Sequence, residues 1–486
     1  MIVGPLRRFH RRPVALLEPG PGPRRLRVRA DWTDRTYTTK RDVERTLAAL
    51  AHAGAACYVP TRLADLRSTT PATDWKLSLW RGRAVAMTHL PTGLRVKSLR
   101  GALGASQDPY RDLMVVLAWL AQRGVEAKSL PAMSWDLWRS TLPAPVRLGA
   151  DAEPGREALF GGRQAAEPGA YWRSVIWDVR SAYPSAMAAS PVAASLREVS
   201  AGTRLDAATP GLARAAVYVP MDLPYAPLPI REAPEVVSYP LGPVTGTWTW
   251  RELHAAVMLG CEVRVEQCWA PRRAEDLFAP WWESVREGRD LPGAAGTMVK
   301  SILNSLWGQF ALRGEGSMDV YWSDDAGECP IEQPLGPRAL PHHYTVHIAA
   351  EIASRVRVQT LMEGIYESGR VQHVDTDGII TSQMGEGPVN QGDAPGQWRA
   401  KAIVHELEVL APQVYRYTAE SDPQIWHYVA AGLSEAGAFE IFRQAPGTRT
   451  RMPILTMDEV TLPTYKATDR EARYQLVREA KKARVA

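Results

Sequence analysis

The stretch VQHVDTDGIITS, residues 371–382, places two aspartates one residue apart between short runs of valine and isoleucine. On a β-strand, side chains i and i+2 point to the same face, so Asp375 and Asp377 should project together from a strand or a hairpin tip. Two carboxylates so close repel each other unless a positive charge separates them or one takes up a proton. The pattern fits either a solvated Asp-Gly turn or a pair of oxygen ligands for a divalent cation, which would need another ligand elsewhere in the chain.

Length and composition are those of an ordinary globular chain. Its 486 residues suggest about three domains; 45% are hydrophobic and 23% charged. No apolar run approaches the about 18 residues of a membrane span, and the N-terminal apolar patch is too short for a signal peptide. We therefore expect no membrane partner and a cytoplasmic location. The four cysteines lack CxxC spacing, which predicts a reduced interior without structural zinc: Cys57, Cys261, Cys268 and Cys329.

Basic residues gather at both ends of the chain. Residues 1–50 carry 12 Lys/Arg against 5 Asp/Glu, although the net charge of the whole chain is only +5. Residues 466–486 add 7 basic against 3 acidic residues. Two interpretations are open: ends that bind a polyanion such as nucleic acid, or solvated termini.

Helix and strand patterns alternate without the regular βαβ rhythm of a parallel sheet, which favours an α+β fold. The stretch 143–170 is rich in Pro, Gly and Ala and is predicted to be a linker at the main domain boundary. Strands and helices are predicted at 26–30, 38–54, 108–124, 174–178, 210–250, 295–313 and 344–363.

A further acidic position lies in WDVRSAYPSAM, residues 177–187. Asp178 closes the apolar strand SVIWD where the chain turns towards a helix at Tyr183, so its carboxylate is expected at the end of a sheet. It is the strongest candidate for the missing cation ligand. An aspartate at this place also fits a simple helix cap.

A third stretch, KSILNSLWGQFALR at 300–313, has the pattern of an amphipathic helix. Lys300, Asn304, Trp307 and Gly308 fall on one face, whereas the apolar residues between them point mostly the other way. A glycine late in a helix costs about 1 kcal/mol relative to alanine, which suggests that a partner approaches closely at Gly308. The alternative is a solvated helix with a chance lysine and asparagine.

Together, the three stretches resemble motifs A, B and C of family B DNA polymerases, which read DxxSLYPS, KxxxNSxYG and YxDTDS. Their order and spacing agree, with 122 residues from Asp178 to Lys300 and 75 from Lys300 to Asp375. Two more elements resemble the protein-primed, phage-type branch: LFGGR at 159–163 stands in place of its YxGG element, and QVY at 413–415 in place of its KxY element.

The resemblance covers roughly residues 158–466 and implies an α+β, right-hand polymerase fold of palm, fingers and thumb. The expected domains are, in order, an exonuclease-like or DNA-binding α/β domain without catalytic acids, a palm with motif A and an insertion, a fingers helix with motif B, a palm segment with motif C, and a thumb with a basic tail. Their bounds are 1–150, 151–290, 291–315, 316–400 and 401–486.

The implied activity is template-directed addition of deoxynucleotides to a 3′-hydroxyl by two-metal phosphoryl transfer. By resemblance, Asp178 and Asp377 bridge two Mg²⁺ ions about 3.5–4 Å apart, which Mn²⁺ can replace, and the Val179 carbonyl adds a ligand. Asp375 supports the metal on the primer side. Lys300 binds the triphosphate and donates a proton to the leaving pyrophosphate. Metal and triphosphate would explain why neighbouring carboxylates tolerate each other.

The resemblance also assigns substrate contacts. Tyr183 lies beneath the sugar of the incoming nucleotide, and Asn304 joins Lys300 on the nucleotide side. Arg286 and Arg289 are further phosphate ligands, with plain solvation as the alternative. The DNA-binding positions are Gly161, Gly162, Ser181, Trp307, Gly308 and Tyr415.

Five positions depart from the family pattern without removing a metal ligand. Leu159 replaces the tyrosine of YxGG, Trp307 the tyrosine of motif B, and Gln413 the lysine of KxY. His373 and Gly378 replace the tyrosine and the serine of motif C. These changes affect surfaces next to primer and template, so they bear on substrate preference and rate.

Alternative functions are a polymerase-like DNA-binding protein with weak or no catalysis, a primer-independent primase-polymerase, and a reverse transcriptase on a similar palm. Retention of the three aspartates with Lys300 and Asn304 argues against a mere binder, because clustered acids repel phosphate. The expected partners are template and primer DNA, deoxynucleoside triphosphates and a terminal priming protein, in a phage or mobile element. The mode of priming stays open.

A proofreading 3′–5′ exonuclease needs its own cluster of acids for two-metal hydrolysis. We recognise no complete set in residues 1–157. The nearest substitutes are Glu18, Asp31, Asp34, and Tyr110 with Asp112, whose spacing is too short for a YxxxD motif. We therefore predict that the enzyme does not proofread and that the N-terminal domain guides template with its arginines.

Overall fold

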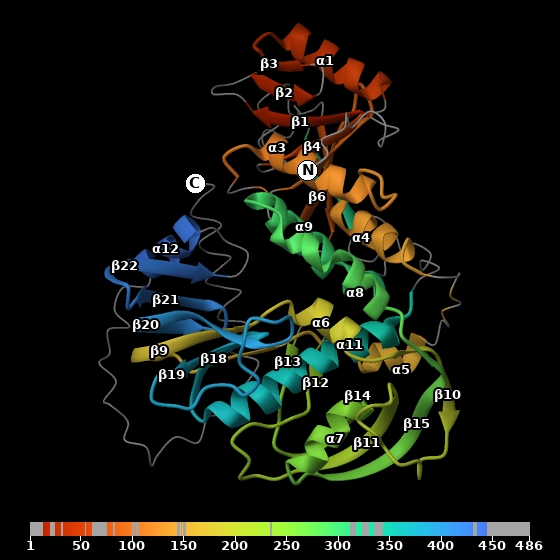
Figure 1. Cartoon of the computed structure of the whole chain (residues 1–486), viewed down its shortest axis with the longest axis vertical. Coiled ribbons are helices and arrows are strands. Elements are labelled where there is room, and N and C mark those ends of the chain that lie inside the picture. Colours follow the sequence, from red (N-terminus) through yellow and green to blue (C-terminus); the bar gives the residue numbers. More distant parts are fainter. Residues whose placement is uncertain are drawn as a thin grey trace. The chain divides into compact units, whose positions relative to one another are not determined.

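The structure, a computed structural model, describes residues 13–19, 25–30, 33–53, 55–60, 75–80, 83–99, 103, 106–142, 146, 148, 152–233, 236–311, 317–322, 330–334, 344–430 and 435–444. Residues 7–12, the basic tail 466–486, Asp31 and Cys329 lie outside these ranges. The chain divides into two compact units (Figure 1). The first unit comprises residues 1–146 and 278–344, so motif B groups with the N-terminal residues; the second comprises 147–277 and 345–486.

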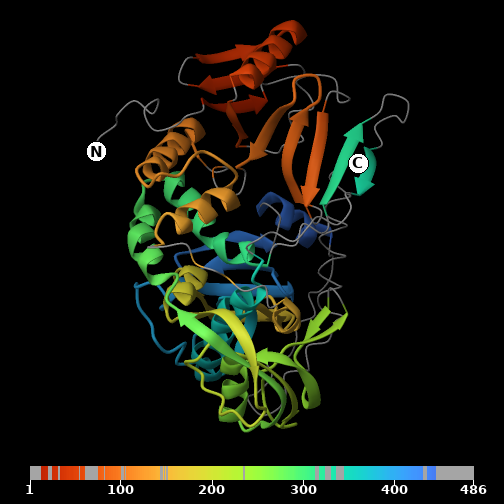
Figure 2. The same ribbon diagram turned by 90° about the vertical axis from the view of Figure 1, so that its right-hand side faces the viewer.

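One mixed sheet organises the first unit. Its described strands, in sheet order, are β17 (Pro330–Pro334), β16 (Ser317–Trp322), β5 (Trp75–Trp80), β6 (Arg83–His89), β7 (Leu94–Ser98), β4 (Ala56–Val59), β1 (Val14–Pro19), β2 (Leu26–Ala30) and β3 (Thr33–Tyr37). β1, β4 and β7 run parallel and the other pairs antiparallel. The β16–β17 hairpin, which follows motif B in sequence, extends the sheet beyond β5 (Figure 2).

Helix α1 (Lys40–His52) confirms the first predicted helix. It begins where the Thr39 hydroxyl accepts a hydrogen bond from the Asp42 N–H at 3.2 Å, which satisfies one of the unpaired donors of the first turn. Its apolar stripe, Val43, Leu47 and Leu50, joins the buried core of the sheet.

The other described helices of this unit comprise motif B and its neighbours. They are α3 (Pro109–Ala121), capped by Asp108 as predicted, α4 (Leu130–Arg139), α8 (Ala279–Val285), a 3₁₀ helix (Arg286–Asp290), α9 (Ala294–Asn304) and α10 (Leu306–Gln309). Phe310 makes edge-on contacts with Trp135, Trp138 and Phe278 at centroid distances of 5.4–5.6 Å. This aromatic cluster anchors the motif B segment to α4 of the same unit.

The single helix predicted over 295–313 is wrong at one point, because the helix is interrupted at Ser305. The N–H and the hydroxyl of Ser305 both donate to the Ile302 carbonyl, at 3.2 and 2.8 Å, and so close a tighter turn there. The predicted apolar face is confirmed: Ile302, Leu303 and Leu306 are fully buried.

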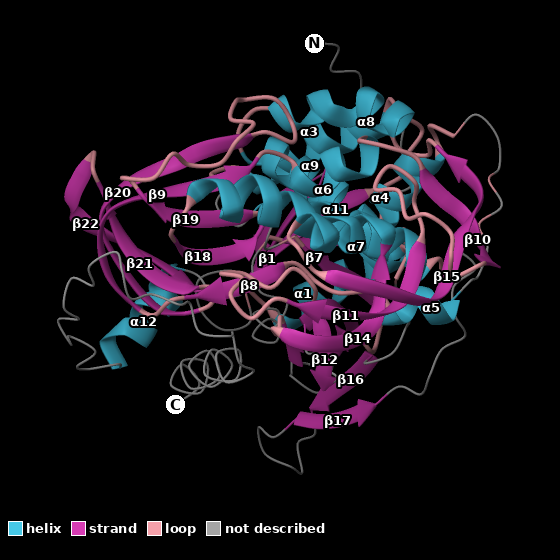
Figure 3. Cartoon of the chain, turned by 90° about the horizontal axis from the view of Figure 1, so that it is seen from below, coloured by secondary structure: helices cyan, strands magenta, loops and turns pink. Residues whose placement is uncertain are grey.

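An antiparallel sheet forms the centre of the second unit. Its described strands, in sheet order, are β22 (Asp422–Ala430), β21 (Val414–Ala419), β20 (Trp398–Ala411), β9 (Gly169–Val179), β19 (Gly378–Ser382), β18 (Val371–Thr376) and β8 (Arg163–Ala166). α11 (Val346–Gln359) and the π-helical turn Thr360–Tyr366 cover one face (Figure 3). The antiparallel pairing beside separate helices confirms the expected α+β class.

The predicted linker at 143–170 is wrong from residue 152 onward. α5 (Ala152–Glu157) is helical there, and β8 pairs with β18 at the edge of the sheet. Small residues allow this edge strand to pack closely, since Ala165 and Ala166 are buried against the core.

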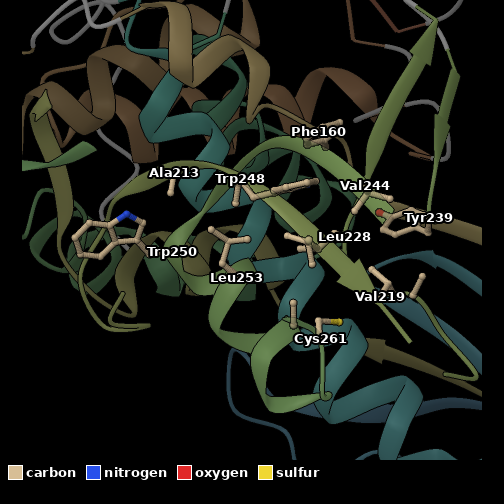
Figure 4. Close-up of a cluster of buried hydrophobic side chains, with 14 of the residues drawn as sticks. Phe160, Ala213, Val219, Leu228, Tyr239, Val244, Trp248, Trp250, Leu253 and Cys261 are labelled. Carbon is tan, nitrogen blue, oxygen red and sulfur yellow. The ribbon is translucent and has the colours of Figure 1, made fainter. Parts of the chain in front are cut away.

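The interval between motifs A and B holds a second antiparallel sheet. Its strands are β10 (Val192–Val199), β15 (Glu262–Glu275), β11 (Leu212–Val219) and β14 (Gly242–Thr249), with α7 (Trp250–Met258) and a small hairpin of β12 (Ile230–Ala233) and β13 (Val236–Ser238). Trp248, Trp250 and Leu253 lie in its core, which also includes Tyr239 and Phe160 (Figure 4). The pieces predicted over 210–250 are thus full strands. The other described elements of this unit are α6 (Ala182–Ala188) and α12 (Glu435–Gln444).

Candidate active site

Three aspartates meet at one end of the central sheet of the second unit. Asp178 on β9 is the cross-strand partner of Gly378 on β19, and Gly378 is the partner of Asp375 on β18. The backbone N–H of Val179 donates to the Asp377 carbonyl at 2.9 Å. The predicted hairpin at 371–382 is confirmed, and it brings both of its aspartates next to the end of β9.

The turn of this hairpin is strained. Thr376, between the two aspartates, has φ of +62°, a region that β-branched residues rarely adopt. Its carbonyl accepts a hydrogen bond from the Thr360 hydroxyl at 2.9 Å, and the Asp377 N–H donates to the Asp375 carbonyl at 2.7 Å. Asp377 therefore belongs to the turn rather than to a strand, so this strained turn, not simple strand alternation, orients it.

The LFGGR segment packs directly on that turn. A Cβ atom on Gly162 would lie 2.4 Å from Cγ2 of Thr376, so only glycine fits there. Beside Gly161 the space is open within 4 Å. The Gly161 carbonyl accepts a hydrogen bond from Arg357 at 3.0 Å, and Arg357 forms a buried ion pair with Glu252 at 2.6 Å.

That ion pair borders a small cavity. The cavity has a volume of about 10 Å³ and is lined by Arg163, Tyr239, Glu252 and Arg357, among others. It has room for about one water molecule and none for a nucleotide.

The motif A turn carries a second strained residue. Ser181 has φ of +58° where β9 passes into α6, and its side chain is buried. Tyr183 follows in the first turn of α6 and is half-buried. Burial, together with the nearby Asp377, raises the pKa of the Tyr183 phenol, so the ring stays neutral.

The QVY segment also reaches the site. The side-chain amide of Gln413 donates to Oδ1 of Asp375, and the Tyr415 ring lies 4.9 Å from that of His373. Burial and the neighbouring Asp375 raise the pKa of Tyr415. Sequence reasoning missed both contacts of this segment.

One cation beside the carboxylates was also missed. Arg399 on β20 is exposed and is the cross-strand partner of Asp178, so the two Cβ atoms lie on the same face, roughly 5 Å apart. Among the described residues, no arginine or lysine forms an ion pair with Asp178 or Asp375. In the sequence, Arg399 simply follows the tripeptide Gly396-Gln397-Trp398.

The predicted nucleotide-side residues lie in the first unit. Lys300 is exposed on α9, and Asn304 ends that helix with its side-chain oxygen buried and without a hydrogen-bond partner among the described residues. Trp307 and Gly308 lie on α10, beyond the break at Ser305. Packing within the described chain does not require the glycine at 308, because the space beside it is open.

The two predicted phosphate arginines lie on the 3₁₀ helix before α9. Arg286 is exposed and pairs with Glu283 at 3.0 Å, so its guanidinium is partly neutralised. Arg289 is half-buried in the last turn. Both arginines precede α9 in the chain.

Comparisons with known proteins now bear on this arrangement. Residues 147–335, with Asp178 and Lys300, match the family model described as DNA polymerase type B, organellar and viral. The fold is similar to that of Phi29 DNA polymerase in complex with primer-template DNA and incoming nucleotides, with a TM-score of 0.66 and 11% identity over 87% of this chain and 92% of that one. This part of the chain thus matches the type B DNA polymerase family, and the chain as a whole has the fold of such a polymerase.

Two further solved structures have the same fold. Phi29 DNA polymerase in its post-translocation complex with primer-template DNA gives a TM-score of 0.65 with 12% identity over 88% of this chain and 94% of that chain. Its complex with single-stranded DNA gives 0.62 with 12% identity over 87% and 93%. No curated protein sequence matches the chain. The right-hand fold expected from the motifs is thereby confirmed.

The oxygen atoms at this sheet end would suit a hard divalent cation. Asp178, Asp377 and the Val179 carbonyl supply only oxygen atoms, which Mg²⁺ prefers. Within the described ranges, no group of three or more His, Cys, Asp or Glu side chains is arranged around a metal position. A site formed by two carboxylates and a backbone carbonyl does not require such a group. No described helix is long and apolar enough to cross a membrane.

Proposed function

We propose that this polymerase adds deoxynucleotides to a DNA primer 3′-hydroxyl under the direction of a template, by two-metal phosphoryl transfer. One observation carries the proposal: Asp178 and the Asp375–Asp377 turn share one sheet end, tied by the Val179–Asp377 hydrogen bond. Phosphoryl transfer needs in-line positioning and neutralised charge rather than covalent catalysis, and a rigid edge of carboxylates meets that need.

Asp178, Asp377 and the Val179 carbonyl would hold two Mg²⁺ ions, with Mn²⁺ as a substitute. When bound, these ions would stabilise charge on the attacking 3′-oxygen and on the leaving pyrophosphate. Asp375 supports the primer side of the site. The strained Thr376 turn fixes Asp375 and Asp377 before substrate arrives, which lowers the cost of assembling the site.

Cationic and steric groups complete the proposed site. Lys300 neutralises the triphosphate and protonates the leaving group, with Asn304, Arg286 and Arg289 as further nucleotide contacts. We assign Arg399 to a substrate phosphate, because it faces the same side as Asp178 without an ion pair to it. Tyr183 excludes a 2′-hydroxyl beneath the sugar.

The similar solved structures contain primer-template DNA and nucleotides, which supports the same partners here. We assign the palm to 151–290 and 316–400, the fingers to 291–315, the thumb to 401–486, and an exonuclease-like or DNA-binding role to 1–150. The organellar and viral family model supports replication of a phage or mobile element in the host cytoplasm or nucleoid. Gly161, Gly162, Ser181, Trp307, Gly308 and Tyr415 are proposed DNA contacts, and a terminal priming protein is a further proposed partner.

Primer extension tests the proposal. The protein should extend a primed DNA template with deoxynucleotides and Mg²⁺, and Asp377→Ala should lower the rate by about 10³-fold, which equals about 4 kcal/mol of transition-state stabilisation. Asp222→Ala, an exposed aspartate in a loop of the same unit, is the matched control and should extend normally. An inactive wild-type protein, or an active Asp377→Ala variant, contradicts the proposal.

A further inference from the structure

Gln413 lies in an unusual place for a glutamine. It belongs to the two-residue turn between β20 and β21, has φ of +61°, and is 8% exposed. In the order of the sheet, three strands separate β21 from β18, yet the turn contacts β18 directly. The sheet therefore curls far enough for this turn to close over the face that carries Asp375.

Two hydrogen bonds fix the turn on β18. The backbone N–H of Gln413 donates to Nε2 of His373 at 2.9 Å, which requires His373 to carry its proton on Nδ1. The side-chain amide of Gln413 donates to Oδ1 of Asp375. Because the Tyr415 ring packs on His373, with centroids 4.9 Å apart, the imidazole is also held from the side.

These contacts treat the two oxygens of Asp375 differently. Oδ1 accepts from Gln413 and also from the Thr376 hydroxyl at 3.4 Å. Oδ2 has no hydrogen-bond partner among the described residues. Since the amide is neutral, the carboxylate is oriented without losing its negative charge to an ion pair.

We infer that Gln413 is a positioning residue, which turns Oδ2 of Asp375 towards the primer-side metal and preserves the charge of that carboxylate. The inference rests on the proposed polymerase function and deepens it. His373, in the place of the motif C tyrosine, supports Gln413 by accepting its backbone N–H.

Gln413 stands where the family has the lysine of its KxY element, and this replacement changes the charge next to Asp375. An ammonium group at position 413 would pair with Asp375 and compete with a divalent cation for its charge. A glutamine keeps the hydrogen bond and removes the competition. His373 thus replaces the motif C tyrosine and Gln413 replaces the KxY lysine, and the two residues contact each other.

Three substitutions separate the hydrogen bond from the charge. Gln413→Met keeps the length but removes the donor, Gln413→Glu changes the donor to a repelling carboxylate, and Gln413→Lys keeps a donor but adds charge. Primer extension is measured as a function of Mg²⁺ and of deoxynucleotide concentration. Gln383→Met, an exposed glutamine beyond β19, is the matched control. DNA binding in EDTA and circular dichroism report the fold of each variant.

We expect the Met and Glu variants to need about 10-fold more Mg²⁺ for half-maximal rate, with the KM for deoxynucleotide unchanged, in the range typical of residues that orient metal ligands. The Lys variant should regain most of the rate at saturating Mg²⁺ but keep a raised Mg²⁺ requirement. A merely structural role would lower the melting temperature without moving the Mg²⁺ requirement.

An unchanged Mg²⁺ requirement in a folded Gln413→Met variant overturns the inference. If that variant does not fold, Gln413→Glu decides by the same measurement, because it differs from the wild type by one group of equal size. The outcomes remain separable from the polymerase proposal itself. Suppose that the wild type extends the primer, Asp377→Ala does not, and the Gln413 variants have the Mg²⁺ requirement of the wild type. That result refutes only the role of Gln413.

Discussion

Asp34 and Asp108 of the first unit have different partners from Asp375 of the second unit. In the first unit, Arg27 holds Asp34 with two hydrogen bonds of 2.9 and 3.1 Å, and Arg29 pairs with Asp108 at 2.8 Å. In the second unit, Asp375 is held by a neutral amide and a hydroxyl. The same residue type is neutralised at one sheet and left charged at the other.

The electrostatics follow this division. The hydrogen bond from Arg27 holds the pKa of Asp34 below its usual range. Burial alone would raise the pKa of Asp108, but hydrogen bonds from Arg29 and from the Arg111 N–H lower it overall. Carboxylates saturated by guanidinium groups have little left to offer a cation, whereas Asp375 keeps its Oδ2 available. The first unit instead presents the exposed cation Lys300.

The largest expected effect tests whether the first unit supplies that cation to the reaction. Lys300→Ala should lower the rate of nucleotide addition by about 10²-fold or more, because it removes both a phosphate ligand and a proton donor. Lys300→Arg should recover nucleotide binding but not the full rate, since guanidinium does not release a proton. Thr297→Ala, exposed on the same helix, serves as the control. Single-turnover kinetics distinguish the two contributions, and an Ala variant with the wild-type rate removes Lys300 from the site.

Tyr183 provides a test within the second unit. Tyr183→Ala should raise ribonucleotide incorporation relative to deoxynucleotides by about 10–100-fold, as expected when a steric block is removed from a pocket. Tyr183→Phe should keep discrimination, because the ring rather than the hydroxyl provides the block. Competition between ribo- and deoxynucleotides in primer extension measures the ratio. An active Ala variant with unchanged discrimination would show that Tyr183 only fills the core.

The two glycines of LFGGR form a matched pair for the strained turn. Gly162→Ala should cost about 1–3 kcal/mol of unfolding free energy, because its Cβ would collide with Thr376. The same collision should lower activity by displacing Asp375 and Asp377. Gly161→Ala meets open space and should be nearly neutral for stability. Chemical denaturation compares the variants, and equal stabilities would mean that the turn is not pinned by this segment.

Some helices and hairpins could be predicted because neighbouring residues in the sequence carry their signals. The helix after Asp108 and the hairpin at 371–382 each carry a cap, a turn or an apolar pattern within a few residues. The composition of 143–170 misled for the same reason, because Pro and Gly there do not show that Arg163–Ala166 pairs with β18. Edge strands made of small residues lack the apolar alternation by which strands are recognised.

The candidate catalytic residues could be predicted from their motifs. The long-range contacts that hold these residues in place could not be predicted from the sequence. Gln413 and Asp375 are 38 residues apart and meet only because the sheet curls. Arg357 and Glu252 are 105 residues apart, and each looks like an ordinary helical surface residue in sequence. Pairing of this kind depends on register and twist, which no local pattern specifies. The three strained residues at the site, Ser181, Thr376 and Gln413, likewise carry no glycine-like signal.

The last prediction is that no effect will be seen: we expect no proofreading activity from the first unit. The prediction that residues 1–157 contain no DxE spacing is wrong, because one occurs at Asp42 and Glu44, but it lies in the first turns of α1. Residues i and i+2 of a helix point about 200° apart, so these carboxylates cannot share an ion. Asp42 also accepts a hydrogen bond from the Thr39 hydroxyl at 2.6 Å.

Three other acids of the first unit, two on strands and one at the start of α3, are no better placed for hydrolysis. Glu18 lies across from Arg27 in the β1–β2 register, and Asp34 and Asp108 pair with Arg27 and Arg29. A 3′-mismatched primer incubated with Mg²⁺ and without nucleotides should therefore stay intact, and Asp34→Asn with Asp108→Asn should change neither this result nor primer extension. Shortening of the primer that persists in Asp377→Ala but disappears in the double variant would show that the arginines do not silence these carboxylates, and the contrast between the two sheets would then fail.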